Sequence, residues 1–298
     1  MTRPHPSSLI PHPSSLYAYP VRFDAHTHLF APGQVLGRES IAMGDPTFRE
    51  MYGDPKAKMA LARDLVAALD EGGIDRAVAA GFAFSHEPDL IEQNEYLCEV
   101  AASSEGRVTA LATVNPALPE WDRVARHAIR LGARGFGELR PHNQGWDPLG
   151  PEGDALCGLA ESEGMVLLWH VSEPLGHAYP GKAGGISPVE LCRVAERFPG
   201  VRMIAAHLGG GLSFYLQMPE LKAAIGNVYF DTAAVSLLYD EASVTRLVDL
   251  AGAGRVLFGS DYPLLSPRRQ LERLLGELPG DVAEAVCGGN AVKLFSDT

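Results

Sequence analysis

The chain has 298 residues, of which 46% are apolar, and a formal net charge of −12. A chain of this size can bury a large core, either as one large α/β domain or as two ordinary ones. The acidic balance argues against nucleic acid or an anionic membrane as a partner, because both require clustered Lys and Arg side chains. We therefore expect a small-molecule substrate, and a homodimer is compatible with this composition.

The composition also predicts the compartment. The four cysteines are far apart in the sequence and form no CxxC pair, so we interpret them as reduced thiols. No apolar run approaches the ~20 residues of a membrane span, and the first residues lack the layout of a signal peptide. These features predict a cytoplasmic protein.

Residues 1–20 differ from the rest of the chain. The hexapeptide PHPSSL occurs at residues 4–9 and again at residues 11–16. A Pro- and Ser-rich segment of this kind cannot bury enough apolar surface to offset the entropy lost on ordering. We predict a flexible low-complexity tail over residues 1–20 and a single catalytic domain over residues 21–298.

From residue 21 onward, short apolar runs alternate with longer helical patterns, which is typical of repeated βα units around a parallel sheet. The predicted strands are residues 21–26, 74–81, 108–114, 133–138, 165–170, 201–207, 228–232 and 255–261. Eight such units in about 275 residues suit a (β/α)8 TIM barrel. The terminal DVAEAVCGGNAVKLF then predicts a C-terminal helical cap. An open doubly wound sheet is the alternative, but no Gly-rich phosphate-binding fingerprint follows the first strand.

Polar side chains end or follow five of these predicted strands. The residues are His26, His28, Glu138, His170, His207 and Asp261. The C-terminal ends of barrel strands carry active sites, and residues two apart on a strand project to the same face. Imidazoles combined with carboxylates suit zinc or another borderline divalent metal. We therefore expect one or two divalent ions, zinc first, bound by these six residues.

Three of these residues have a purely structural alternative. Asp261 can serve as a helix N-cap, and His207 can be a core histidine with its hydrogen bonds satisfied. Glu138 can instead form a salt bridge with Arg140 or with a neighbouring strand end.

The segments FDAHTH, LLWH, MIAAHLGGG, VLFGSDYP and GGNAVKLF resemble the amidohydrolase superfamily of metal-dependent TIM-barrel enzymes. The resemblance is greatest to the amidohydrolase-related branch, which includes aminocarboxymuconate-semialdehyde decarboxylase and the resorcylate decarboxylases beside many hydrolases. It implies that His26, His28, His170 and Asp261 bind a metal. It also implies that His207 binds a second metal or acts on the substrate.

Two glutamates depart from the decarboxylase pattern of that branch. Glu138, at the end of the fourth strand, resembles the bridging ligand of binuclear members such as the TatD-like and phosphotriesterase-like enzymes. Glu173, three residues after His170, resembles the HxxE of adenosine- and cytosine-deaminase relatives, in which the glutamate handles protons.

The main functional expectation is a metal-dependent hydrolase that cleaves a C–O or C–N bond of a small organic substrate. A bound metal lowers the pKa of its water to about 7, and Asp261 would take the proton and pass it to the leaving group. His207 and Glu173 are the other catalytic candidates. The candidates for substrate binding follow the fourth and fifth strands, where basic groups suit a carboxylate-bearing substrate. They are Arg140, His142, Tyr179 and Lys182.

Two other functions are compatible with the same residues. The first is non-oxidative decarboxylation of an aromatic or unsaturated carboxylic acid, in which an acidic residue protonates carbon. The second is a barrel that binds a ligand without catalysis, because fold does not determine function.

Overall fold

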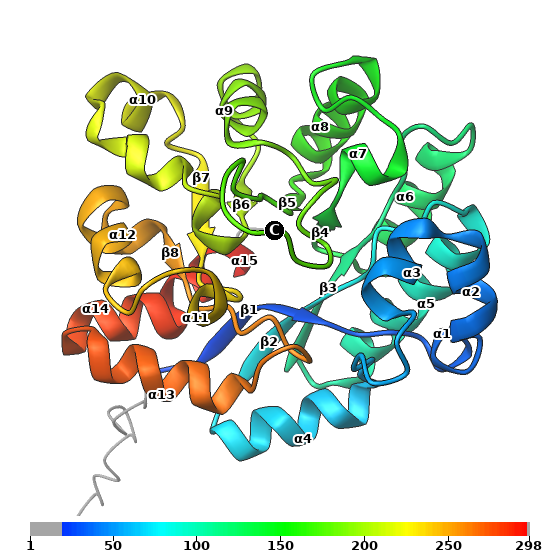
Figure 1. The fold of residues 1–298 in the computed structure, drawn as a ribbon, viewed down its shortest axis with the longest axis horizontal. Helices are drawn as coiled ribbons and strands as arrows, with labels where there is room; N and C mark the ends of the chain where they lie inside the picture. The colour runs from blue at the N-terminus through cyan, green and yellow to red at the C-terminus, as the bar shows by residue number, and fades with distance from the viewer. Residues whose placement is uncertain (1–19, 297–298) are drawn as a thin grey trace, which may run out of the picture.

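The structure is a computed structural model that describes residues 20–296 (Figure 1). The predicted tail lies, apart from Pro20, outside the described residues. Eight parallel strands pair in sequence order from β1 to β8. They are β1 Phe23–His28, β2 Arg76–Ala80, β3 Val108–Ala112, β4 Gly135–Leu139, β5 Val166–Trp169, β6 Met203–Ala205, β7 Val228–Asp231 and β8 Val256–Leu257.

The segment after β8 closes the ring of strands against β1. The backbone N–H of Ala25 donates to the carbonyl of Phe258 (2.7 Å), and that of Asp261 donates to the carbonyl of His26 (3.0 Å). All eight predicted strands are present, and the (β/α)8 barrel predicted from the sequence is confirmed.

Helices surround this ring (Figure 1). The principal ones are α4 Ala62–Gly72, α5 Glu87–Ser103, α6 Trp121–Arg130, α8 Pro151–Glu163, α9 Pro188–Arg197, α10 Pro219–Ala224, α12 Ser243–Ala251 and α13 Pro267–Glu277. Helix α9 shows why these segments fold locally, because the Ser187 side chain accepts from the N–H of Glu190 while Pro188 takes the first helical position. None of the helices in the described part of the chain is long and apolar enough to cross a bilayer.

The connection between β1 and α4 contains three short helices that the sequence did not predict. They are α1 Pro32–Leu36, α2 Arg38–Gly44 and α3 Pro46–Tyr52. Helix α3 begins after Asp45, whose carboxylate accepts from the N–H of Phe48 (2.9 Å). The ring of Tyr52 packs against those of Phe30 and Phe82, with centroids 4.8 and 5.7 Å apart. This connection therefore places an aromatic cluster beside the barrel.

The C-terminal helix α15 (Asn290–Ser296) closes one end of the barrel. Leu294 and Phe295 join the buried side chains of the strands in one hydrophobic cluster. The ring of Phe295 lies 5.8 Å from that of Phe23, the first residue of β1, so α15 covers the N-terminal ends of the strands. The predicted C-terminal cap is confirmed, and the other end of the barrel is left for the site.

Candidate metal centre

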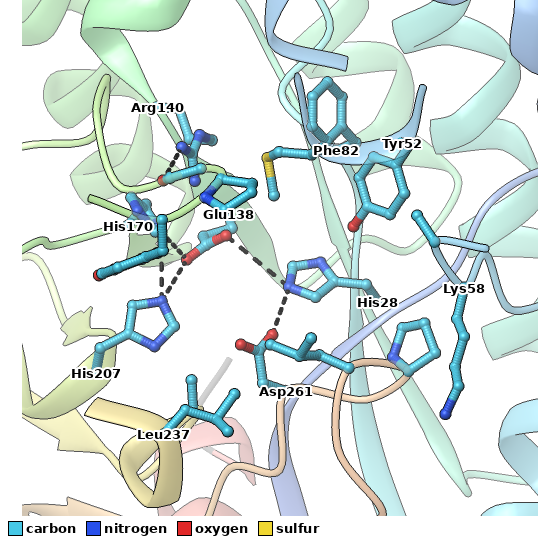
Figure 2. Close-up of a pocket in the computed structure, with 18 of the residues that line it drawn as sticks. His28, Tyr52, Lys58, Phe82, Glu138, Arg140, His170, His207, Leu237 and Asp261 are labelled. Carbon is cyan, nitrogen blue, oxygen red and sulfur yellow. Dashed lines mark hydrogen bonds and ion pairs between the residues drawn. The ribbon is translucent and has the colours of Figure 1, made fainter. Parts of the chain in front are cut away.

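The structure brings together all six residues predicted as metal ligands at the C-terminal ends of the strands. They form two groups, and within each group the ligand atoms all lie within 4.8 Å of one another. The groups are His26, His28 and Asp261, and Glu138, His170 and His207. Most members of both groups line one pocket and point toward its centre (Figure 2).

The first group is built by β1 and the segment that closes the ring. His26 and His28 are two residues apart on β1, so both imidazoles project to the barrel mouth, and their Nε2 atoms lie 3.0 Å apart. Asp261 places Oδ1 3.4 Å from Nε2 of His28 and 3.9 Å from Nε2 of His26. Asp261 has a φ of 63°, in the left-handed region that Asp tolerates better than most residues.

The second group comes from β4, β5 and the end of β6. Oε1 of Glu138 lies 2.8 Å from Nδ1 of His170 and 3.4 Å from Nε2 of His207. The remaining ring nitrogen of His207, Nδ1, faces the carbonyl of Ala233 at 2.9 Å. A partner at one ring nitrogen fixes which nitrogen is free to bind a metal.

The Gly-rich run after His207 allows this arrangement. Gly210 has a φ of 56°, and a Cβ there would lie 2.7 Å from the backbone of Ser172. Only glycine fits such an approach. The backbone after β6 can therefore pass close to the backbone after β5.

Glu138 belongs to the second group and also faces the two histidines of the first. Its Oε1 is 3.9 Å from Nε2 of His26 and its Oε2 is 3.9 Å from Nε2 of His28. No ion pair joins Glu138 to Arg140 in the described part of the chain, whereas its carboxylate does contact the neighbouring strand end through Nδ1 of His170 (2.8 Å). The position of Glu138 suits a ligand that either binds one ion or bridges two.

Asp231, at the end of β7, is a site residue that the sequence analysis missed. Its Oδ2 accepts from Nδ1 of His26 at 2.7 Å, and its Oδ1 accepts from the backbone N–H of His207 at 3.0 Å. It is fully buried. The signal was present in the sequence, because the run VYFD ends in a carboxylate just as other strand runs end in a ligand. A carboxylate behind a histidine ligand orients the ring and raises its basicity.

We expect the variant Asp231→Asn to bind divalent metal about 10- to 100-fold more weakly than the native protein, because loss of such a partner has that effect on metal affinity. Competition with a chelator of known affinity measures the change. Asp240→Asn is the matched control, because Asp240 is exposed and pairs with Arg246 on the surface. Equal affinities of Asp231→Asn and native protein would show that Asp231 does not support the ligand.

Charges in the centre compensate one another when no metal is bound. Burial alone would lower the pKa of His26, but the charge and hydrogen bond of Asp231, with the charges of Glu138 and Asp261, raise it to about 10. Burial likewise opposes protonation of His207, but its hydrogen bond to Glu138 and the charge of Asp261 raise its pKa to about 9. At neutral pH these two histidines therefore carry protons where a cation would bind.

The carboxylates of the centre are ionised. Burial would raise the pKa of Glu138, but hydrogen bonds from His170 and His207 and the positive charge of His26 hold it well below its usual range. Burial also opposes ionisation of Asp261, and contacts with His28 and His26 lower its pKa to about 2. Four imidazoles and two ionised carboxylates that converge at hydrogen-bond distance form a donor set that fits a borderline divalent metal.

The centre forms one end of a cavity of about 510 Å³. Tyr52, Phe82 and Met51 form an apolar wall, and Lys56 and Lys58 are exposed residues at its rim. Figure 2 shows Tyr52 and Phe82 across the cavity from His207 and Leu237. Sequence reasoning missed this wall because aromatic residues in a long connection match no motif.

The predicted substrate-binding residues separate into two sets. Arg140 and Tyr179 line the cavity. His142 and Lys182 are absent from its lining, since His142 pairs with Glu190 (3.1 Å) and Lys182 donates to the carbonyl of His177 (2.9 Å). These two side chains are therefore occupied by neighbours in the loops after β4 and β5.

Glu173 also lies outside both ligand groups and outside the cavity lining. Its carboxylate accepts hydrogen bonds from the hydroxyls of Tyr179 (3.1 Å) and Tyr239 (2.5 Å). The spacing from His170 resembles an HxxE motif, but the loop turns Glu173 toward these tyrosines. A proton-handling role for Glu173 stays a prediction.

A barrel with a buried cluster of imidazoles and carboxylates at its mouth defines a class of metal-dependent enzymes, and comparisons with known proteins identify the family. The sequence model of the family described as Amidohydrolase matches residues 23–296, so the chain belongs to this family. A curated relative, 6-methylsalicylic acid decarboxylase of Penicillium expansum, is 31% identical over 123 residues, which is 34% of this chain and 37% of that protein. The match thus spans little more than a third of the relative's length.

Solved structures share the whole fold. The 5-carboxyvanillate decarboxylase of Sphingomonas paucimobilis has a TM-score of 0.71 and 17% identity, covering 93% of this chain and 99% of its own. The 5-carboxyvanillate decarboxylase of Novosphingobium aromaticivorans, solved with manganese, has a TM-score of 0.73 and 18% identity, covering 93% of this chain and 96% of its own. At these identities the likeness shows the fold.

These findings correct the main functional expectation. The curated relative and the two structural neighbours named above are decarboxylases, so the expected hydrolysis of a C–O or C–N bond is wrong. The error has a physical cause. The same histidine and carboxylate ligands serve both chemistries. Glu138 also resembles the bridging ligand of binuclear hydrolases, which favoured hydrolysis when only motifs were compared.

Proposed function

We propose that the protein is a metal-dependent, non-oxidative decarboxylase of a small aromatic carboxylic acid. The observation that carries the proposal is the ligand cluster at one end of a cavity of about 510 Å³ whose opposite wall is aromatic. A single substituted benzene ring fits a cavity of this size, and an aromatic wall binds such a ring by stacking or edge contacts. The activities of the relatives named above support the same reaction class.

The metal would be held by His26, His28, Asp261 and His170, with Glu138 and His207 completing the site around one or two ions. We propose zinc from the imidazole-rich donor set. Manganese, present in one of the similar decarboxylase structures, is the alternative. When bound, such an ion supplies a Lewis acid that orients the acid group and stabilises negative charge.

In this reaction the bond between the ring carbon and the carboxylate carbon breaks, CO₂ leaves, and the electron pair stays on the ring. That carbon then holds one proton from the enzyme. We assign the proton transfer to Asp261, which lines the cavity and lies 3.4 Å from His28. Because its carboxylate is ionised, Asp261 would take this proton from water and pass it to the ring carbon. Tyr52 and Phe82 hold the ring and exclude water from its face.

We expect the metal-loaded protein to release CO₂ and the matching phenol from at least one acid in a panel that contains 6-methylsalicylate and 5-carboxyvanillate. Chelation should lower the rate at least about 100-fold, because the metal contributes several kcal/mol to such reactions. Elemental analysis, CO₂ detection and chromatography of the phenol measure this. Restoration by zinc and manganese, each tested separately, identifies the ion. Absence of CO₂ from every acid with fully loaded protein would contradict the proposal.

A further inference from the structure

Arg140 is a buried cation whose hydrogen bonds are incomplete. It follows β4 directly and is only 2% exposed. Its Nε donates to Oδ1 of Asn143 (2.9 Å), and its Nη2 donates to the carbonyls of Gly181 and Ala183. Its Nη1 is buried and has no hydrogen-bond partner among the described residues.

The charge of this guanidinium is also unpaired. No carboxylate in the described part of the chain forms an ion pair with it, because Glu138, two residues earlier, turns its carboxylate to His170. Burial lowers the pKa of Arg140, which reflects the cost of holding the charge away from water. Buried charges in proteins are normally paired and hydrogen-bonded. The charges of Glu138 and Glu50 act on Arg140, but it forms no ion pair with a carboxylate among the described residues.

The unpartnered donor belongs to a side chain that lines the cavity of the metal centre. Arg140 lies beside His170, whose pKa is lowered to about 4 by burial and by the positive charge of Arg140. Figure 2 shows the guanidinium above His170 and Glu138, on the side of the cavity away from Tyr52. Nη1 itself is covered by its neighbours, so an anionic ligand in this cavity reaches it by displacing the groups that cover it.

Arg140 also holds the β5–α9 loop, which comprises residues 170–187. Besides His170, four residues of this loop line the cavity, namely His177, Tyr179, Pro180 and Gly181. Gly181 is fixed from two sides, because its carbonyl accepts from Arg140 and its N–H donates to Oε1 of Glu50 (3.1 Å). Arg140 therefore holds the loop and also lines the cavity.

We propose that Arg140 binds a carboxylate of the substrate through Nη1 and thereby couples substrate binding to ordering of the β5–α9 loop. This rests on the proposed function in that the substrate is a carboxylic acid. In this arrangement Nη2 keeps its hydrogen bonds to the carbonyls of Gly181 and Ala183 in the loop, while Nη1 binds and positions the anion. Because coupling between two events is reciprocal, an anion that fixes the guanidinium also stabilises the loop.

The test compares two ligands of nearly equal shape and different charge, 2-methylbenzoate and 2-methylbenzamide. Their dissociation constants are measured by calorimetry on the metal-loaded native protein and on Arg140→Met, Arg140→Lys and Arg126→Met. Arg126→Met is the charge-matched control, because Arg126 lies on the outer helix α6 and pairs with Asp122. Hydrogen exchange of residues 170–187, with and without 2-methylbenzoate, reports the loop.

We expect the preference for benzoate over benzamide to fall about 10- to 100-fold in Arg140→Met, the range of a buried charge-assisted hydrogen bond. Arg140→Lys should retain part of it, and Arg126→Met all of it. Benzoate should increase protection of the loop in the native protein but not in Arg140→Met. If Arg140→Met misfolds, Arg140→Lys and the native exchange data still decide.

An unchanged preference in Arg140→Met, or loop protection in the native protein that benzoate does not increase, would overturn the inference and leave Arg140 as a structural support of the loop. The two proposals fail separately. Binding that depends on Arg140 without release of CO₂ from any acid refutes the decarboxylase and retains the anion site. Release of CO₂ together with an unchanged preference for benzoate in Arg140→Met refutes the anion site and retains the decarboxylase.

Discussion

Replacing His26 with alanine is expected to abolish metal binding and turnover together. The imidazole contacts members of both ligand groups, with Nε2 3.0 Å from Nε2 of His28 and 3.9 Å from the nearest oxygens of Glu138 and Asp261. Loss of a ligand that faces both groups weakens binding of one ion or two. The loss of affinity should exceed the roughly 10- to 100-fold cost of removing a partner that only orients a ligand.

The same change leaves Asp231 buried without the Nδ1 donor that it contacts at 2.7 Å. An unsatisfied buried carboxylate costs about 1–3 kcal/mol or more, so His26→Ala should also unfold at lower denaturant concentration. Elemental analysis, CO₂ release and chemical denaturation measure the three effects. His127→Ala is the control, because His127 lies on α6 and pairs with Glu95 on the surface. Full metal content and activity in His26→Ala would remove His26 from the centre.

The convergence of the ligands could be predicted from the sequence because barrel geometry constrains it strongly. Parallel strands bring their C-terminal ends to one face, so a polar residue that ends an apolar run is directed to that face. His26 and His28 illustrate this, since the two-residue spacing on β1 alone places both rings on one side. The same rule predicts that Asp231, which ends β7, faces the site. The rule was not applied to that strand end in the sequence.

The cavity wall and the reaction class could not be predicted in the same way. Tyr52 comes from a connection with short helices, whose Pro and Gly residues give too little periodicity to indicate a helix. Phe82 follows β2 as one more apolar residue in an apolar run. Arg140 was predicted as one loop cation among several, and only the structure shows that Nη2 holds the carbonyls of Gly181 and Ala183 while Nη1 has no partner.

Metal affinity is expected to rise about 100-fold for each pH unit between about pH 7 and 8.5. In the metal-free protein the pKa of His26 is raised to about 10, chiefly by Asp231 acting against burial, and that of His207 to about 9 by Glu138 and Asp261. Both lie above the ordinary 6.5. A metal must therefore displace about two protons at neutral pH, and each displaced proton contributes a tenfold change per unit.

Stability of the metal-free protein should change in the opposite direction. The raised pKa values of His26 and His207 mean that the folded chain binds these protons more tightly than the unfolded chain does. Their contribution is complete below about pH 6.5 and is lost as the pH rises through 9 and 10. His170 acts differently, because burial and the charge of Arg140 lower its pKa to about 4. The unfolded chain binds this proton more tightly than the folded chain, so His170 reduces stability only as the pH falls below 6.5.

Chelator competition at several pH values measures the affinity, and calorimetry in buffers of different ionisation enthalpy counts the protons released. Asp231→Asn provides the internal comparison, since removing the carboxylate beside Nδ1 should lower the pKa of His26 and reduce the release by about one proton. A metal-loaded sample should keep its midpoint of unfolding between pH 7 and 9 while the metal-free sample loses stability. A pH-independent affinity over this range would show that no protons occupy the centre, and the charge balance derived for it would be wrong.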